Sequence, residues 1–67
     1  MTVALAAFPQ LRAICWNRRP DDTVDGAEAL ALYERNWRHV QPEAFTLEEQ
    51  ALLDALVARY GGGVLNV

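Results

Sequence analysis

The stretch YERNWRHV holds the densest group of side chains that could bind a partner or carry chemistry. Its arginines, asparagine and histidine offer many hydrogen-bond donors in a short run. If the stretch is helical, residues three and four apart share one side, so Leu32, Arg35 and His39 lie together. Arginine and aromatic residues dominate the binding energy of many protein interfaces. We therefore predict a protein-binding face that is formed by Leu32, Arg35, Asn36, Arg38 and His39.

A solvated helix face is the simpler alternative for the same residues, with Glu34 and Arg38 paired four residues apart. Catalysis by His39 would need an orienting group and a cleft, and the sequence indicates neither. Cys15 lies at an inward position, which is typical of a core residue rather than a nucleophile. We predict no catalytic residue, no small-molecule substrate and no enzymatic activity.

The acidic segment that begins at Asp21 resembles the first half of an EF-hand calcium loop. The twelfth position of such a loop requires a bidentate glutamate, and Leu32 stands there instead. Thr23 also occupies the third position, where aspartate or asparagine is usual. Helix capping explains the same aspartates, so we predict no metal site and no cofactor.

A small basic patch is formed by Arg12, Arg18 and Arg19. Nucleic-acid binding relies on basic charge that displaces counterions, but the chain has a formal net charge of −3. Asp21 and Asp22 also lie directly beside the patch. Nucleic acid is therefore not the favoured partner. A dimeric DNA-binding transcriptional regulator is the alternative function.

Chain length and cysteine content indicate how the fold must be stabilised. A chain of 67 residues, 52% of them hydrophobic, forms one domain with a small core. Cys15 is the only cysteine, so no disulfide can form within the chain. Partner binding is a remaining source of stability. The single cysteine, the missing export signal and the absence of a long apolar run predict a cytoplasmic protein without a membrane partner.

Helix signals divide residues 1–67 into an all-α, compact three-helix mini-domain. Pro9 suits the first position of a helix over about 9–17. Asp25 and Glu28 have the spacing of a capping box for a helix over about 25–39, as do Thr46 and Glu49 for a helix over about 46–60. The apolar positions with helical spacing predict three inward-facing stripes: Phe8, Leu11, Ile14 and Cys15; Leu30, Tyr33, Trp37 and Val40; Leu52, Leu53, Leu56, Val57 and Tyr60.

The chain ends in YGGGVLNV, where an apolar segment follows three glycines. Gly61 is expected to close the last helix in the left-handed conformation, and the next two glycines let the chain turn. Residues 64–67 have the composition of a short β-strand. They could dock on the protein's own helices, pair with a second copy, or extend a partner's sheet. We add Val64, Leu65 and Val67 to the predicted partner-binding residues.

The phrases ALALYERNWRHV and YGGGVLNV resemble those of small bacterial proteins of unassigned function, some of which are encoded beside nucleotidyltransferase-like toxin genes. The resemblance implies a small partner protein, such as an antitoxin-like component of a two-protein system, and transfers no catalytic residue. Together with the residues themselves, it favours a protein-binding module that acts as a homodimer or within a toxin–antitoxin pair.

Overall fold

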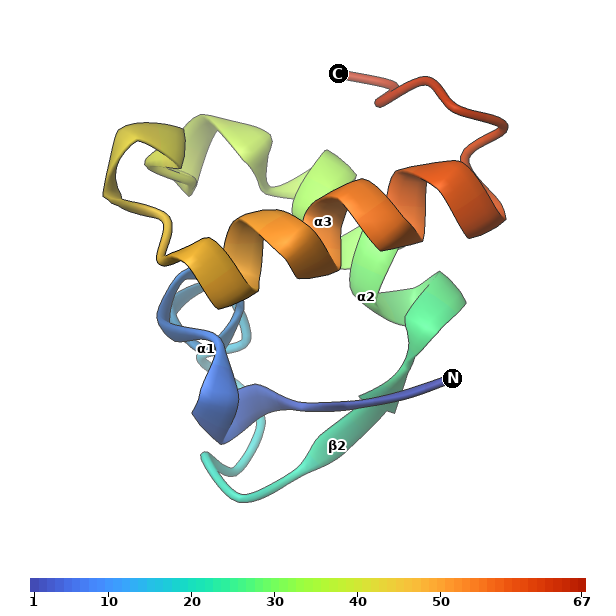
Figure 1. Cartoon of the computed structure of the whole chain (residues 1–67). Helices are drawn as coiled ribbons and strands as arrows, with labels where there is room; N and C mark the ends of the chain where they lie inside the picture. The colour runs from blue at the N-terminus through green and yellow to red at the C-terminus, as the bar shows by residue number, and fades with distance from the viewer.

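Three α-helices and a two-stranded antiparallel sheet form the fold in the computed structural model, which describes residues 1–67 (Figure 1). The Cα radius of gyration is 10.7 Å, close to the roughly 11 Å that a compact chain of this length has. None of the helices is both long and apolar enough to cross a membrane. In chain order, the elements are β1 (Thr2–Ala4), α1 (Pro9–Ile14), β2 (Thr23–Asp25), α2 (Gly26–Arg35) and α3 (Leu47–Tyr60), with 3-10 turns at Leu5–Ala7, Trp37–His39 and Pro42–Ala44.

Two of the predicted helices end earlier than expected. α1 stops at Ile14 rather than near residue 17, because Cys15 leaves helical dihedrals. α2 stops at Arg35, and the Asn36 side chain donates to the Leu32 carbonyl at 3.0 Å. An asparagine amide that bonds the backbone in this way competes with continuation of the helix. The third helix matches its prediction, with Thr46 as N-cap.

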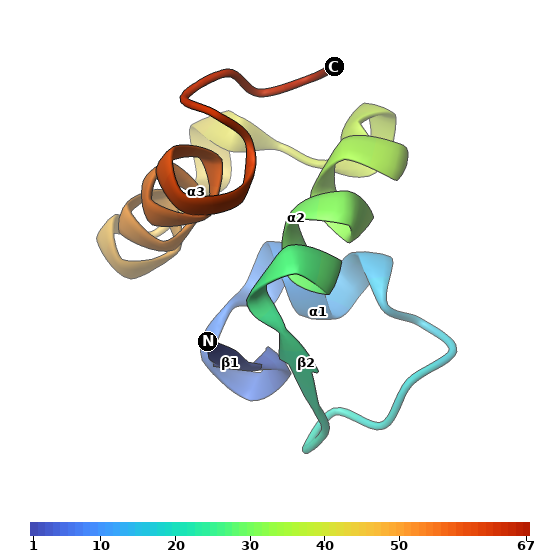
Figure 2. The ribbon, with the colours of Figure 1, turned by 90° about the vertical axis from the view of Figure 1, so that its right-hand side faces the viewer.

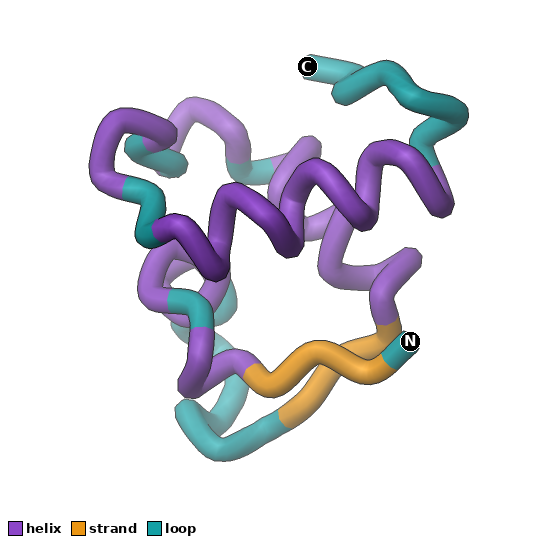
Figure 3. Tube along the Cα trace, in the orientation of Figure 1, coloured by secondary structure: helices purple, strands orange, loops and turns teal.

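The prediction of an all-α fold missed the small sheet, which Figure 3 shows in orange. β1 and β2 pair so that Val3 lies opposite Val24. Both valines are buried and their strand neighbours are exposed, which is the alternation of a half-buried strand. Conversely, residues 64–67 form no strand. A strand needs a partner for its backbone groups, and β1 and β2 supply one to each other.

α2 lies at the centre of the packing (Figure 2). It contacts α3 on one side and α1 with both strands on the other. Tyr33, in the middle of α2, is fully buried. Around it lies the core cluster of Val3, Leu5, Leu11, Ile14, Cys15, Val24, Ala29, Leu30, Leu32, Val40, Leu52, Leu53 and Leu56. The three predicted stripes supply most of these residues. Trp37 and Val57 are half-buried, and Tyr60 is exposed.

Glu49 departs from its predicted capping-box role. The Thr46 half forms, because its Oγ1 accepts from the Glu49 N–H at 3.1 Å. The Glu49 carboxylate, however, is completely buried and accepts from the backbone N–H groups of Gln10 (3.0 Å) and Leu11 (2.9 Å) and from the Tyr33 hydroxyl (2.6 Å). α1 has no side-chain cap of its own, so α3 supplies one. One carboxylate thereby joins all three helices.

The other predicted capping box forms only in part. Asp25 accepts from the Ala27 N–H at 3.2 Å and caps α2, as expected. Glu28 does not reach back to it but pairs with Arg18 at 3.1 Å, which ties α2 to the loop after α1. In both boxes, the glutamate at the third helical position makes a tertiary contact instead of a local one.

The C-terminal segment folds back over α2 and α3 (Figure 1). Gly61 keeps a negative φ of −103°, so the prediction of a left-handed Gly61 was wrong, and Gly62 (65°) and Gly63 (85°) take positive φ instead. A Cβ on Gly61 would lie 2.9 Å from the Val64 carbonyl oxygen, so any side chain there would force the backbone to shift. Beyond the turn, Leu65 packs against the core cluster.

Candidate functional site

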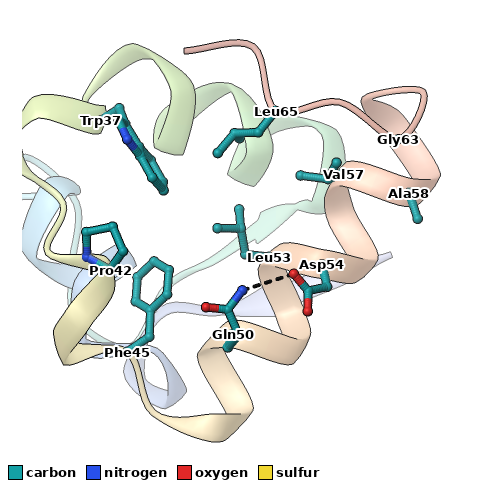
Figure 4. Close-up of a pocket in the computed structure, with 10 residues that line it drawn as sticks. All are labelled: Trp37, Pro42, Phe45, Gln50, Leu53, Asp54, Val57, Ala58, Gly63 and Leu65. Carbon is teal, nitrogen blue, oxygen red and sulfur yellow. Dashed lines mark hydrogen bonds between the residues drawn. The ribbon is translucent and has the colours of Figure 1, made fainter.

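An open apolar groove lies between α3 and the segment that joins it to α2 (Figure 4). Residues of α3 form one wall, and the aromatic segment 37–45 forms the other. Leu65 of the C-terminal segment points into it from a third direction (Figure 4). The groove has a volume of about 560 Å³ and is lined by Trp37, Pro42, Phe45, Gln50, Leu53, Asp54, Val57, Ala58, Gly63 and Leu65.

The aromatic wall of the groove is continuous with the core. Phe45 packs edge-on against Trp37, with ring centroids 6.5 Å apart, and against Tyr33 at 6.4 Å. Edge-to-face pairs at these distances are attractive. Since Tyr33 is fully buried and hydrogen-bonded to Glu49, the core network holds one end of this row of rings. The wall is therefore formed by the fold itself rather than by mobile surface residues.

The polar groups of the groove lie on one side of it. Gln50 and Asp54 are one helical turn apart on α3, and the Gln50 amide donates to Asp54 Oδ1 at 3.0 Å. Asp54 is the only charged residue that lines the groove. The remaining surface offers an apolar cavity with a carboxylate at its edge, which suits a ligand with an apolar body and a cationic group.

The predicted partner-binding face requires one correction. Leu32 was expected at the surface beside Arg35 and His39, but it is buried, with only 7% of its surface exposed. The reason is tertiary: α2 is covered on two sides, by α3 and by α1 with the sheet. A leucine off the main stripe therefore still meets a neighbour. Its side chain belongs to the core, and the small part that is exposed lines a depression together with Arg35 and Trp16.

Three polar members of that face, Arg35, Asn36 and His39, line depressions next to an unpredicted tryptophan, whereas Arg38 is exposed and lines neither. Asn36 and His39 line a depression of about 290 Å³ with Trp16, which is 84% exposed. Trp16 and Arg35 line a neighbouring depression. Trp16 follows α1 and falls outside the inward stripe predicted for residues 9–17, and this spacing is the signal that could have predicted its exposure. The structure thus places an exposed aromatic residue beside the arginine-rich face.

His39 lies among few groups that could assist chemistry. It is the only titratable residue lining its depression, and its Nε2 accepts from Arg38 Nε at 3.3 Å. No three His, Cys, Asp or Glu side chains come together in a way that could hold a metal ion. Within the loop that resembles a calcium site, Asp25 caps α2 instead.

Two buried groups have perturbed acidity, and burial is the main cause for both. The pKa of the Cys15 thiol is raised by burial, which disfavours the reactive thiolate. The pKa of Tyr33 is raised well above its usual range by burial and by its hydrogen bond to Glu49. Neither group reaches an open cavity, so both belong to the core.

The C-terminal residues of the predicted site are apart from the Trp16 depression, and they divide between the groove, which Leu65 lines, and a separate depression that Val64 lines with Leu30 and Tyr60. Leu65 lines the groove, whereas Val64 and Val67 are 66% and 65% exposed. No residue lines both the groove and the Trp16 depression. The predicted set therefore does not form one continuous surface. No family model matches this chain, and no similar curated protein or solved structure was found.

Proposed function

We propose that the protein is a small protein-binding module and that the apolar groove is its main binding surface. The observation that carries the proposal is the half-buried row of Trp37 and Phe45, held against the core yet open to a cavity of about 560 Å³. Apolar pockets of roughly 300–1,000 Å³ with few polar groups are typical binding sites. Aromatic residues are also the anchors of protein interfaces.

The shape of the lining favours a helical ligand. One wall is the helix α3, which presents Leu53 and Val57 one turn apart, and the opposite wall presents Trp37 and Phe45. An amphipathic helix places its apolar residues every three or four positions and lays them into such a groove. An antitoxin-like role in a two-protein system is the biological setting that the sequence resemblance suggests. A homodimer is the alternative setting.

The DNA-binding alternative has weaker support. Within the basic patch of Arg12, Arg18 and Arg19, Arg18 is paired with Glu28 at 3.1 Å and Arg19 with Asp21 at 3.3 Å, so only Arg12 takes part in no ion pair. Arginines that are already paired contribute less to the displacement of counterions from phosphates. The exposed Trp16 and its neighbours Arg35 and His39 are better suited to a second protein contact.

The test uses a synthetic amphipathic helix of leucine and glutamine, about 18 residues long, as an uncharged probe. Binding is followed by the fluorescence of Trp37 in a Trp16→Phe background, so that the signal comes from the groove. Ala58→Arg places a long charged side chain at the groove. Ala55→Arg is the matched control, because Ala55 is exposed on the same helix but does not line the groove.

We expect saturable binding that Ala58→Arg weakens at least tenfold and Ala55→Arg leaves within about twofold. Both variants lie at exposed alanines, so both should keep the thermal stability of the parent. No saturable binding by the parent, or equal weakening by the two arginine variants, would overturn the groove as the binding surface.

A further inference from the structure

We infer that the groove takes an amphipathic helix of a second protein that carries lysine or arginine beside its apolar stripe. The inference rests on the proposed function and adds the chemistry of the partner. It follows from how charge is distributed along the chain and around the groove.

The acidic excess of the protein is confined to the half of the chain that builds most of the groove. Residues 1–40 contain five arginines and five carboxylates, and their formal charge is zero. Residues 41–67 contain four carboxylates, Glu43, Glu48, Glu49 and Asp54, against Arg59 alone, so this half carries the whole net charge of −3. The ion pairs follow the same division, since all three involve groups within residues 1–28.

One of these carboxylates, Asp54, lies on the groove, and a second, Glu43, is carried by a turn that contributes a lining residue. Only Oδ1 of Asp54 is engaged, by the Gln50 amide. Glu43 is exposed on the short turn that carries the lining residue Pro42 and precedes Phe45. Neither takes part in an ion pair. The one arginine of this half, Arg59, has its guanidinium over the Tyr60 ring, 5.8 Å from the centroid. The only charge on the groove lining is thus Asp54, and no ion pair neutralises this acidic edge.

A separate partner explains this edge better than a second copy in a groove-to-groove dimer. In a symmetric dimer both copies contribute the same patch, so both Asp54 carboxylates would lie in one interface, and no basic residue of the groove lining could pair with them. Like charges across an interface suppress association, whereas opposite charges speed it and fix the orientation. A helix with an apolar stripe would pack against the aromatic walls, and a cation beside the stripe would pair with Asp54.

The experiment compares two synthetic helices with the same leucine stripe, one with lysine and one with glutamate at the other positions. Affinities are measured by Trp37 fluorescence in the Trp16→Phe background at low ionic strength. We expect the lysine helix to bind about tenfold more tightly. Asp54→Lys should remove or reverse this preference. Glu48→Lys, the same charge change on α3 at an exposed residue that does not line the groove, should keep most of it.

The outcomes separate the two proposals. If both helices bind the groove equally well, the protein-binding function stands and the inference of a basic partner is overturned. If Glu48→Lys and Asp54→Lys weaken the lysine helix equally, the preference reflects overall charge, and the inference fails again. If neither helix nor the uncharged probe binds, the proposed function itself fails. A dimer in solution that Ala58→Arg dissociates would instead place a second copy in the groove and overturn the inference.

Discussion

At the scale of single residues, Glu49 is the group whose burial would cost the most free energy without hydrogen bonds. Burial of an isolated carboxylate costs several kcal/mol, and this cost must be offset by hydrogen bonds to the charged form. Glu49 receives two backbone N–H groups and one hydroxyl, and no buried side-chain polar atom of the protein is left without a partner. The same bonds cap α1 and orient Tyr33. Stability should therefore be sensitive to small changes at this site.

Glu49→Gln should lower the free energy of unfolding by about 2–3 kcal/mol, because an amide offers one acceptor oxygen to three donors. Tyr33→Phe should lower it by about 1–2 kcal/mol, since it removes one hydrogen bond to the carboxylate. Urea denaturation measures both. Glu48→Gln is the control at an exposed neighbour and should stay within about 0.5 kcal/mol. Equal stability of the variants at positions 48 and 49 would contradict the network.

Tyr33 also predicts how stability changes at high pH. Burial, and then the hydrogen bond to Glu49, raise its pKa in the folded state above the usual value of about 10. The unfolded chain therefore loses this proton first, so the contribution is complete below about pH 10 and is lost as the pH rises further. The raised pKa of Cys15 acts in the same direction, so the comparison is made in a Cys15→Ala background.

The measurement is the free energy of unfolding between about pH 8 and 11. Tyr33→Phe should flatten the alkaline decrease. Tyr60→Phe, at a tyrosine that is 37% exposed, should retain it. The same decrease in both variants would show that Tyr33 is not its source.

At the scale of secondary-structure elements, the C-terminal segment is held by few contacts. Leu65 packs on the core, and the Asn66 N–H donates to Glu34 at 3.0 Å. The turn before it depends on Gly62 and Gly63, whose positive φ other residues rarely adopt. Of the three places predicted for this segment, the structure shows docking on the protein's own helices.

A chain that ends at Gly63 should lose about 1 kcal/mol of unfolding free energy, because half-buried Leu65 contributes about half of a full leucine burial. Thermal or urea denaturation of the two chains measures this loss. Val67→Ser alters an exposed residue and should change little. Unchanged stability of the shortened chain, together with lost binding of a partner, would place the segment in an interface.

At the scale of the whole molecule, the core consists of 14 buried hydrophobic residues in a chain of 67. Cores of this size supply only about 3–5 kcal/mol, so a ligand that binds the folded state has a large relative effect. A ligand at one hundred times its Kd adds about 2.7 kcal/mol. A partner that binds the folded protein would therefore also stabilise the fold.

The purified protein should be a monomer across a dilution series, because a groove-to-groove dimer would bring acidic edges together. Light scattering measures the mass, and the chain ending at Gly63 should give the same result, since its missing residues dock within one copy. A full-length dimer that becomes monomeric on truncation would instead make the C-terminal segment a self-association element.

Local signals in the sequence determined the main helices. Thr46 and Asp25 cap α3 and α2, and Pro9 begins α1, because capping and proline geometry act within one helical turn. Periodicity also identified most of the core, since residues with helical spacing share one face.

The tertiary structure decided what depends on segments far apart in the chain. Val3 became a strand residue because it pairs with Val24, and Leu32 became buried because α2 is covered on two sides. Glu49 left its local capping role because the N-terminus of α1 lies within reach and has no cap of its own. The groove likewise joins residues 37–45, 50–58 and 65. The spacing of residues within one element cannot predict this groove, because its lining residues come together only when the helices pack.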